Sequence, residues 1–274
     1  YEKEKILINI EPYYKWEVIT TTLKKYKGSY DKYVANNYDE LIDSPIELGN
    51  HKTYKFYVGD TPHVYAIIGD GNYDINKIIK DSTKIIKSTH KIFKDIPYNE
   101  YIFFLHLTSN QYGGLEHKNC SMLSFNRLGF KKRKSYIKFL GLVSHEFFHV
   151  FNVKRIRPTE LESFNYHDEN YTNLLWISEG STSYYDNLLL KRSNVISKEE
   201  YFCLIENDIK LLNQNPGRKV QSLNDSSFDS WIKFYKIDEN TPNSVVSYYL
   251  KGSLVSLLID LMLISDTDGN KSFD

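Results

Sequence analysis

Two spacings of apolar residues divide the chain into a first half rich in predicted strands and a second half rich in predicted helices. Short runs of β-branched and aromatic residues between turn signals predict strands. These runs are Ile6–Ile10, Trp16–Thr20, Thr53–Val58, His63–Ile68, Tyr101–Leu107 and Ser121–Phe125. Between Asp74 and Asp95 isoleucine recurs at helical spacing among Lys, Asn and Ser, which predicts one amphipathic helix before Pro97.

The second half of the chain predicts four helices. They cover residues 135–154, 171–192, 198–214 and 244–265. Ser197-x-x-Glu200 is a capping box that starts the third helix, and Pro216-Gly217 ends it. Strands that come first and helices that come later are typical of an α+β fold.

Composition excludes several classes of protein. Lys plus Arg and Asp plus Glu both number 35 among 274 residues, so we expect no basic surface for nucleic acid or anionic lipid. Two cysteines, Cys120 and Cys203, cannot form a disulfide framework. The longest apolar stretch, Leu254–Ile264, contains Asp260 and is shorter than the ~20 residues that span a bilayer. The sequence therefore predicts a soluble protein that binds neither nucleic acid nor membrane.

The two ends of the sequence predict that it is an excerpt of a longer protein. It opens on Tyr1 and stops at Asp274, just after a turn-like Asp268-Gly269-Asn270. The absence of a signal peptide therefore says nothing about export. The compartment stays open, and we favour the cytoplasm.

His145-Glu146-Phe147-Phe148-His149 is the pattern with the clearest chemistry in this chain. Two imidazoles four residues apart lie on one face of a helix, where they can share a Zn²⁺ ion. The glutamate between them can reach the water that the metal binds. The motif therefore predicts a zinc-dependent hydrolase.

A zinc ion held by two histidines needs a third protein ligand and an open position for water. Glu179 is the first candidate, because it lies in the apolar run Leu174–Gly180, where an unpaired carboxylate is costly to bury. An exposed glutamate on the polar side of that helix is the alternative. His167, in the intervening loop, is a second candidate ligand.

Four motifs in the same order resemble the glycyl aminopeptidase family of zinc metallopeptidases, peptidase family M61. They are Gly113–Asn119, His145–Pro158, Trp176–Tyr185 and Ser247–Gly252. The resemblance implies a gluzincin, in which His145, His149 and Glu179 bind the metal.

The same resemblance implies a division into domains. Family members have a β-rich N-terminal domain, a thermolysin-like catalytic domain and usually a C-terminal PDZ domain. On this template, residues 1–48 are the end of the first domain. Residues 49–274 are the catalytic domain, with a small mixed sheet, a mainly helical second half and a truncated C-terminal end. A PDZ domain is expected beyond it.

The family also implies roles for side chains outside the metal set. Glu146 is the expected general base, because a carboxylate between two ligand histidines can take the proton of the attacking water. The related M1 aminopeptidases use a Tyr-x-Lys-Gly motif to stabilise the oxyanion, which points to Tyr249 ahead of its neighbour Tyr248. Glu116 is expected to hold the free α-ammonium group of a peptide, and Gly114 to let the substrate approach the edge strand.

The expected function is therefore a zinc aminopeptidase that removes N-terminal residues from peptides, with Gly or Ala preferred by resemblance alone. An endopeptidase or oligopeptidase on the same scaffold is one alternative, and a non-catalytic zinc-bearing module that binds peptides is another. Phe151, Ser181 and Cys120 depart from the usual family pattern. Since Ser181 is two residues from Glu179, these departures bear mostly on side-chain preference. The natural substrate and the oligomeric state stay open.

Overall fold

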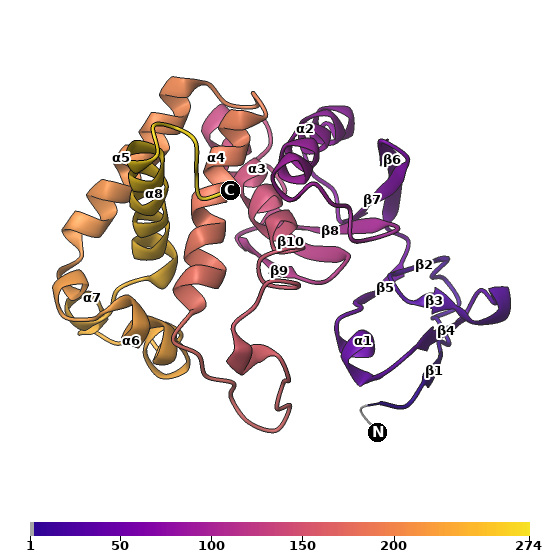
Figure 1. Cartoon of the computed structure of the whole chain (residues 1–274). Helices are drawn as coiled ribbons and strands as arrows, with labels where there is room; N and C mark the ends of the chain where they lie inside the picture. The colour runs from indigo at the N-terminus through magenta and orange to yellow at the C-terminus, as the bar shows by residue number, and fades with distance from the viewer. Residues whose placement is uncertain (1–2) are drawn as a thin grey trace. The chain divides into compact units, whose positions relative to one another are not determined.

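The computed structural model describes residues 3–274, so Tyr1 and Glu2 lie outside the described residues. The chain forms two compact units: residues 1–83 with 96–150, and residues 84–95 with 151–274. Figure 1 labels the strands and helices. The strands are β1 Ile6–Asn9, β2 Val18–Thr21, β3 Lys24–Lys25, β4 Lys32–Ala35, β5 Ile46–Gly49, β6 Lys52–Val58, β7 Thr61–Ile68, β8 Tyr101–Thr108, β9 Gly113–Glu116 and β10 Cys120–Asn126. The α-helices are α1 Tyr38–Ile42, α2 Ile75–Phe93, α3 Arg133–Phe148, α4 Thr182–Arg192, α5 Lys198–Gln214, α6 Leu223–Phe228, α7 Thr241–Ser244 and α8 Tyr248–Asp266.

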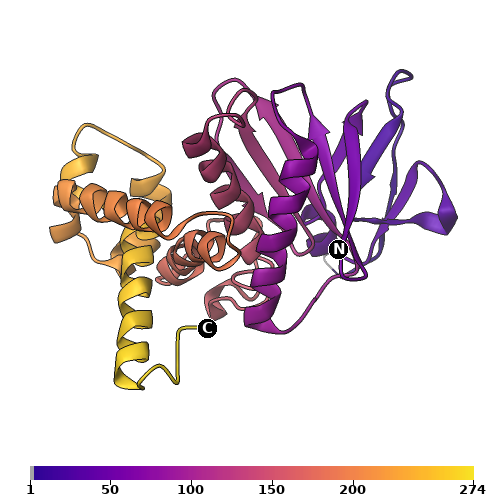
Figure 2. The same cartoon turned by 90° about the horizontal axis from the view of Figure 1, so that it is seen from above.

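A five-stranded mixed sheet is the centre of the first unit. Its order is β6-β7-β8-β10-β9, with β7, β8 and β10 parallel and the two outer strands antiparallel to their neighbours. The strands lie side by side in Figure 2. The central strand β8 is buried from Tyr101 to Leu105, which is typical of a strand covered on both faces. The small mixed sheet expected from the sequence is confirmed, and β9 is its edge strand.

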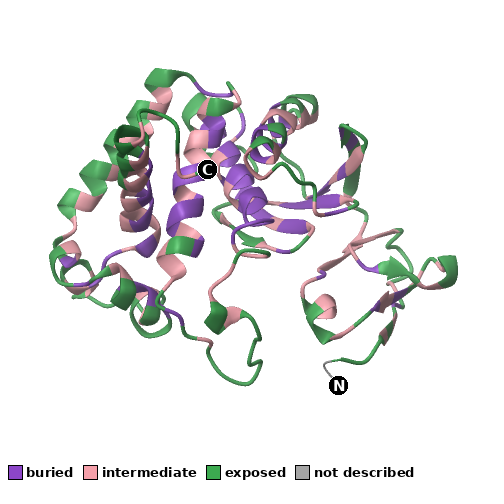
Figure 3. Ribbon diagram, viewed as in Figure 1, coloured by how far each residue is buried: buried purple, intermediate pink, exposed green. Residues whose placement is uncertain are grey.

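Aromatic side chains pack α3 against one face of this sheet. Tyr101 and Phe103 are two residues apart on β8 and therefore point to the same face. The Phe147 ring of α3 meets the Tyr101 ring edge-on at 5.0 Å between centroids, and Phe103 stacks on Tyr65 of β7 at 4.7 Å. Most residues of β8, β10 and α3 are buried, as the purple ribbon in Figure 3 shows. A packed aromatic layer therefore stabilises the position of α3 on the sheet.

Residues before β6 form two smaller sheets, β1-β4-β3 and β2-β5, both antiparallel. Their core consists of Ile10, Leu23, Tyr33 and Ala35. The sequence predicts β1 and β2 but not β4 and β5. β4 and β5 are four residues long, which is too short for an apolar alternation to stand out in the sequence.

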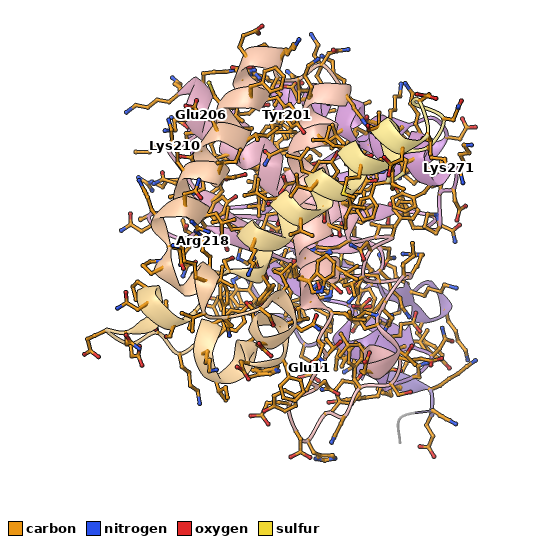
Figure 4. The ribbon with its side chains drawn as sticks, turned by 60° about the vertical axis from the view of Figure 1, so that its left-hand side comes forward. Glu11, Tyr201, Glu206, Lys210, Arg218 and Lys271 are labelled. Atoms are coloured by element: carbon orange, nitrogen blue, oxygen red, sulfur yellow. The ribbon has the colours of Figure 1, made fainter. Side chains whose placement is uncertain are left out.

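Most of the second unit is helical, and α5 begins and ends at the residues predicted. Ser197 accepts a hydrogen bond from Glu200 N–H while the Glu200 carboxylate accepts one from Ser197 N–H, so the capping box is confirmed. Figure 4 shows Glu206 and Lys210 on this helix, and their side chains form an ion pair at 2.7 Å. Such exposed i,i+4 pairs add only a few tenths of a kcal/mol.

Three other predicted helix boundaries were wrong. The helix expected over 135–154 ends at Phe148, because Val150 N–H donates to the Phe147 carbonyl and tightens the last turn. The helix expected over 171–192 begins at Trp176, with a π-helix over Trp176–Ser181 before α4. The helix expected over 244–265 begins at Tyr248, because Ser247 caps it through Leu250 N–H.

One stretch in the described part of the chain, Thr241–Asp266, is long and apolar enough to cross a membrane by length and composition alone. In its most apolar window 39% of the residues are buried inside the protein, and a core helix of a soluble protein passes the same test. The sequence-based limit of Leu254–Ile264 was too short, because Asp260 does not interrupt the helix. Its buried carboxylate accepts hydrogen bonds from the Tyr184 hydroxyl and from Phe273 N–H.

Candidate functional site

His145 and His149 lie one turn apart at the C-terminal end of α3, as the motif predicts. Their rings are nearly perpendicular, with centroids 4.7 Å apart, and one nitrogen of each lies within 4.8 Å of the other. Two imidazoles on a tetrahedral metal have nitrogens about 3.3 Å apart, since each bond is about 2.0–2.1 Å. The two nitrogens are therefore near enough for both rings to hold one ion.

Glu146 points toward the edge strand β9. Its side chain is 4% exposed, and a Cβ placed on Gly114 would lie 2.2 Å from Glu146 Oε1. Gly114 and Glu116 share a face of β9, since they are two residues apart. The carboxylates of Glu116 and Glu146 and one ring nitrogen of His149 lie within 4.8 Å of one another. The first unit therefore brings together five of the residues predicted for the site: Gly114, Glu116, His145, Glu146 and His149.

Tyr101 lies close to this group on the sheet. Burial raises the pKa of its phenol well above the usual value, and the negative charge of Glu146 raises it further. The Tyr101 hydroxyl therefore stays protonated. Ser121, which pairs with Glu116 across β10 and β9, is also fully buried and acts on the Tyr101 pKa in the opposite direction.

Glu179 lies in the second unit, within the π-helix Trp176–Ser181. It is partly buried, so the alternative of a fully exposed glutamate does not hold. A π-helical turn is rare and is often found at functional positions. His167, the second candidate ligand, is exposed in the loop before this turn and belongs to neither set of described side chains that could hold a metal ion.

Asn152 fixes the π-helix by its side-chain amide. The amide nitrogen donates to the carbonyls of Ile177 and Ser178 and to the Thr182 hydroxyl, each at 3.1 Å. These carbonyls flank Glu179 on its N-terminal side. Sequence reasoning missed Asn152, although it stands three residues after His149, where the motif helix has already ended.

Tyr248 and Tyr249 open α8, and their rings stack at 4.7 Å between centroids. Tyr248 is buried, whereas Tyr249 is partly exposed. Burial is the main cause that raises the Tyr249 pKa far above its usual value, followed by the negative charge of Glu179. The Tyr249 hydroxyl is therefore a permanent donor near the carboxylate of Glu179.

Two glycines bring α8 against the π-helix. A Cβ on Gly180 would lie 2.6 Å from Gly252 Cα, and a Cβ on Gly252 would lie 2.9 Å from both Gly180 Cα and the Trp176 carbonyl oxygen. The backbones of the π-helix and α8 are therefore in contact close to Glu179 and Tyr249 in the sequence. A glycine within an apolar helical run is the signal that could have identified Gly252.

Residues 138–255 match the family profile of the M61 glycyl aminopeptidase, and residues 1–50 match the peptidase M61 N-terminal domain. No curated protein matches the chain. Among solved structures, the chain is similar to the crystal structure of an aminopeptidase N family protein from Idiomarina loihiensis, with 31% sequence identity and a TM-score of 0.94. This similarity covers 99% of this chain and 48% of that chain.

In sequence and in its mixed α+β fold, the chain is similar to members of a peptidase family. The two family matches together cover more than half of its residues, and the chain belongs to the M61 peptidase family. It spans about half the length of the solved relative.

Proposed function

We propose that this chain is the metal-binding part of a zinc-dependent aminopeptidase with a thermolysin-like, gluzincin catalytic domain. His145, His149 and Glu179 are the proposed ligands, and they form one of two sets of described side chains that could hold a metal ion. Two imidazoles and one carboxylate are a donor set that suits Zn²⁺ with a position left for water. Residues 1–48 are the proposed end of the β-rich domain, and residues 49–274 the proposed catalytic domain.

The observation that carries the proposal is the placement of Glu146. Its carboxylate is buried beside the proposed ligand His149 and beside Glu116, which is partly buried on the edge strand β9. Zinc in such a site supplies a Lewis acid that makes water a nucleophile at neutral pH. Glu146 accepts the proton of the attacking water and passes it to the nitrogen of the leaving amine.

Tyr249 is the proposed donor to the carbonyl oxygen as that oxygen gains negative charge. Its raised pKa keeps the hydroxyl protonated, which a hydrogen-bond donor requires. Tyr248 is the weaker candidate, because it is buried, whereas Tyr249 is partly exposed; the hydroxyls of both lie near that of Tyr235, at 3.3 and 3.5 Å.

Glu116 decides between removal of N-terminal residues and internal cleavage. Its carboxylate lies within 4.8 Å of that of Glu146. An α-ammonium group bound to Glu116 would therefore lie one residue from the peptide bond whose hydrolysis Glu146 assists. A free N-terminus therefore gains a charge-assisted contact that a blocked one lacks. Preference for Gly or Ala is proposed on the family alone.

The test measures bound zinc and then the release of a chromogenic amine from Gly- and Ala-derivatives. We expect about one zinc per chain, and a loss of at least ~10³-fold in kcat for Glu146→Gln with zinc retained. Equal activity of the two proteins would refute the proposal. Glu116→Ala is expected to raise KM for free N-termini while sparing any cleavage of N-blocked peptides. If blocked peptides are cleaved as well as free ones by the wild type, the function is that of an endopeptidase.

A further inference from the structure

We propose that Gly114 is a positioning residue for Glu146, not a point of approach for substrate. The inference rests on the proposed role of Glu146 as the general base. Three atoms of the Glu146 side chain occupy the space of a side chain at residue 114. A Cβ there would lie 2.2 Å from Oε1, 2.3 Å from Cδ and 2.4 Å from Cγ. Carbon contacts at optimal separation are 3.5–4.0 Å, so the two groups exclude each other.

Backbone conformation does not explain the glycine at this position. Gly113, its neighbour, has a φ of +152° and meets nothing within 4 Å, so conformation alone favours glycine there. Gly114 has no positive φ and pairs regularly with Leu123 of β10. Space for Glu146 is therefore the requirement that distinguishes the second glycine from the first.

Gly114 bounds the Glu146 carboxylate on one side, and other groups bound it elsewhere. On the sheet, the phenol of Tyr101 is close enough for its pKa to respond to the charge of Glu146. On β9, the Glu116 carboxylate repels that of Glu146 within 4.8 Å. A group that is 4% exposed and bounded in this way has few other positions to adopt.

Gly114→Ala should displace the base without unfolding the protein. The clashing atoms are the end of a flexible side chain, which can rotate, whereas the strand cannot move without breaking its pairing with β10. Because Cγ clashes as well as the carboxylate, a rotation of the carboxyl group alone is insufficient. The carboxylate therefore moves by about 1 Å or more, and a misplacement of this size costs about 10²-fold in rate.

The first experiment compares Gly114→Ala with the control Gly141→Ala on α3, where an added Cβ meets nothing within 4 Å among the described residues. We expect Gly114→Ala to lower kcat about 10²-fold, with KM, zinc content and unfolding midpoint close to wild type. The control should retain wild-type kcat. A raised KM with an unchanged kcat would assign Gly114 to substrate approach and overturn the inference.

A double-mutant cycle and a crystal structure test the contact directly. Glu146→Asp withdraws the carboxylate by about 1.5 Å, one carbon–carbon bond. In that background Gly114→Ala should cost less than about 10-fold, and equal losses in both backgrounds would refute the contact. In the crystal structure of Gly114→Ala the Glu146 carboxylate should be displaced, and an unmoved carboxylate would overturn the inference even if the wild type proved inactive. Inactivity of the wild type itself would count only against the proposed function.

Discussion

Asn152→Ala should loosen the π-helical turn that carries Glu179. The Asn152 amide is the donor in three hydrogen bonds of 3.1 Å, two of them to the carbonyls just before Glu179. Because the Ile177 and Ser178 carbonyls accept from this amide, the side chain of Asn152 contributes to the stability of the π-helical turn. The substitution removes that donor and leaves the rest of α4 intact.

The magnitude follows from what each acceptor retains. The amide has two hydrogens for three acceptors, so the contacts together contribute about 2 kcal/mol net. The Ser178 carbonyl keeps the Thr182 hydroxyl at 2.7 Å, so it still has a hydrogen-bond donor after the substitution. We therefore expect the free energy of unfolding to fall by about 1–2 kcal/mol. Because Glu179 is the proposed ligand, zinc affinity should fall about 10-fold.

The assay is urea unfolding in the presence of a chelator, followed by zinc competition with a chromogenic chelator. Asn243→Ala in α7 is the matched control, because the exposed side-chain amide of Asn243 donates to the Asn240 side-chain oxygen at 3.2 Å. Asn152→Asp should be worse than Asn152→Ala, since a carboxylate cannot donate and repels the two carbonyls. If both Asn152 variants unfold and bind zinc like the control, the assigned role is wrong.

Three further outcomes are expected. Gly252→Ala should destabilise the protein by about 2–3 kcal/mol, since the added methyl group meets backbone atoms at 2.9 Å that cannot rotate away; Gly141→Ala is its control in calorimetry. Tyr249→Phe should lower kcat about 10²-fold with zinc retained, whereas Tyr248→Phe should not, and the reverse order would exchange their roles. Burial and the charge of Asp186 raise the pKa of Asp208 to about 6, above its unfolded value near 3.9, so its stabilising contribution is present below pH 4 and is lost as pH rises through 6. At pH 7.5 the free energy of unfolding of Asp208→Asn should therefore exceed that of the wild type by about 1 kcal/mol, after allowance for solvent screening. A difference that does not shrink as the pH falls toward 4 would refute this.

Local patterns in the sequence predicted the elements that depend on local chemistry. The capping box at Ser197 and the spacing of apolar residues place α5 without error, and His145 and His149 fall on one helix face as their spacing requires. The π-helix before α4 was not predictable, because it is held by Asn152 from outside the helix. The short strands β4 and β5 gain their pairing from β1 and β2, and not from a pattern of their own.

Three glycines lie against the side chains that the proposed chemistry uses, and each excludes a side chain for reasons of space. Gly114 faces the carboxylate of Glu146, while Gly180 and Gly252 touch next to Glu179 and Tyr249. In the first case the obstacle is a side chain that can rotate, so an added methyl group should reduce activity and leave stability nearly unchanged. In the second case the obstacle is backbone, so the same methyl group should reduce stability. The atom that a glycine faces therefore determines which property its substitution changes.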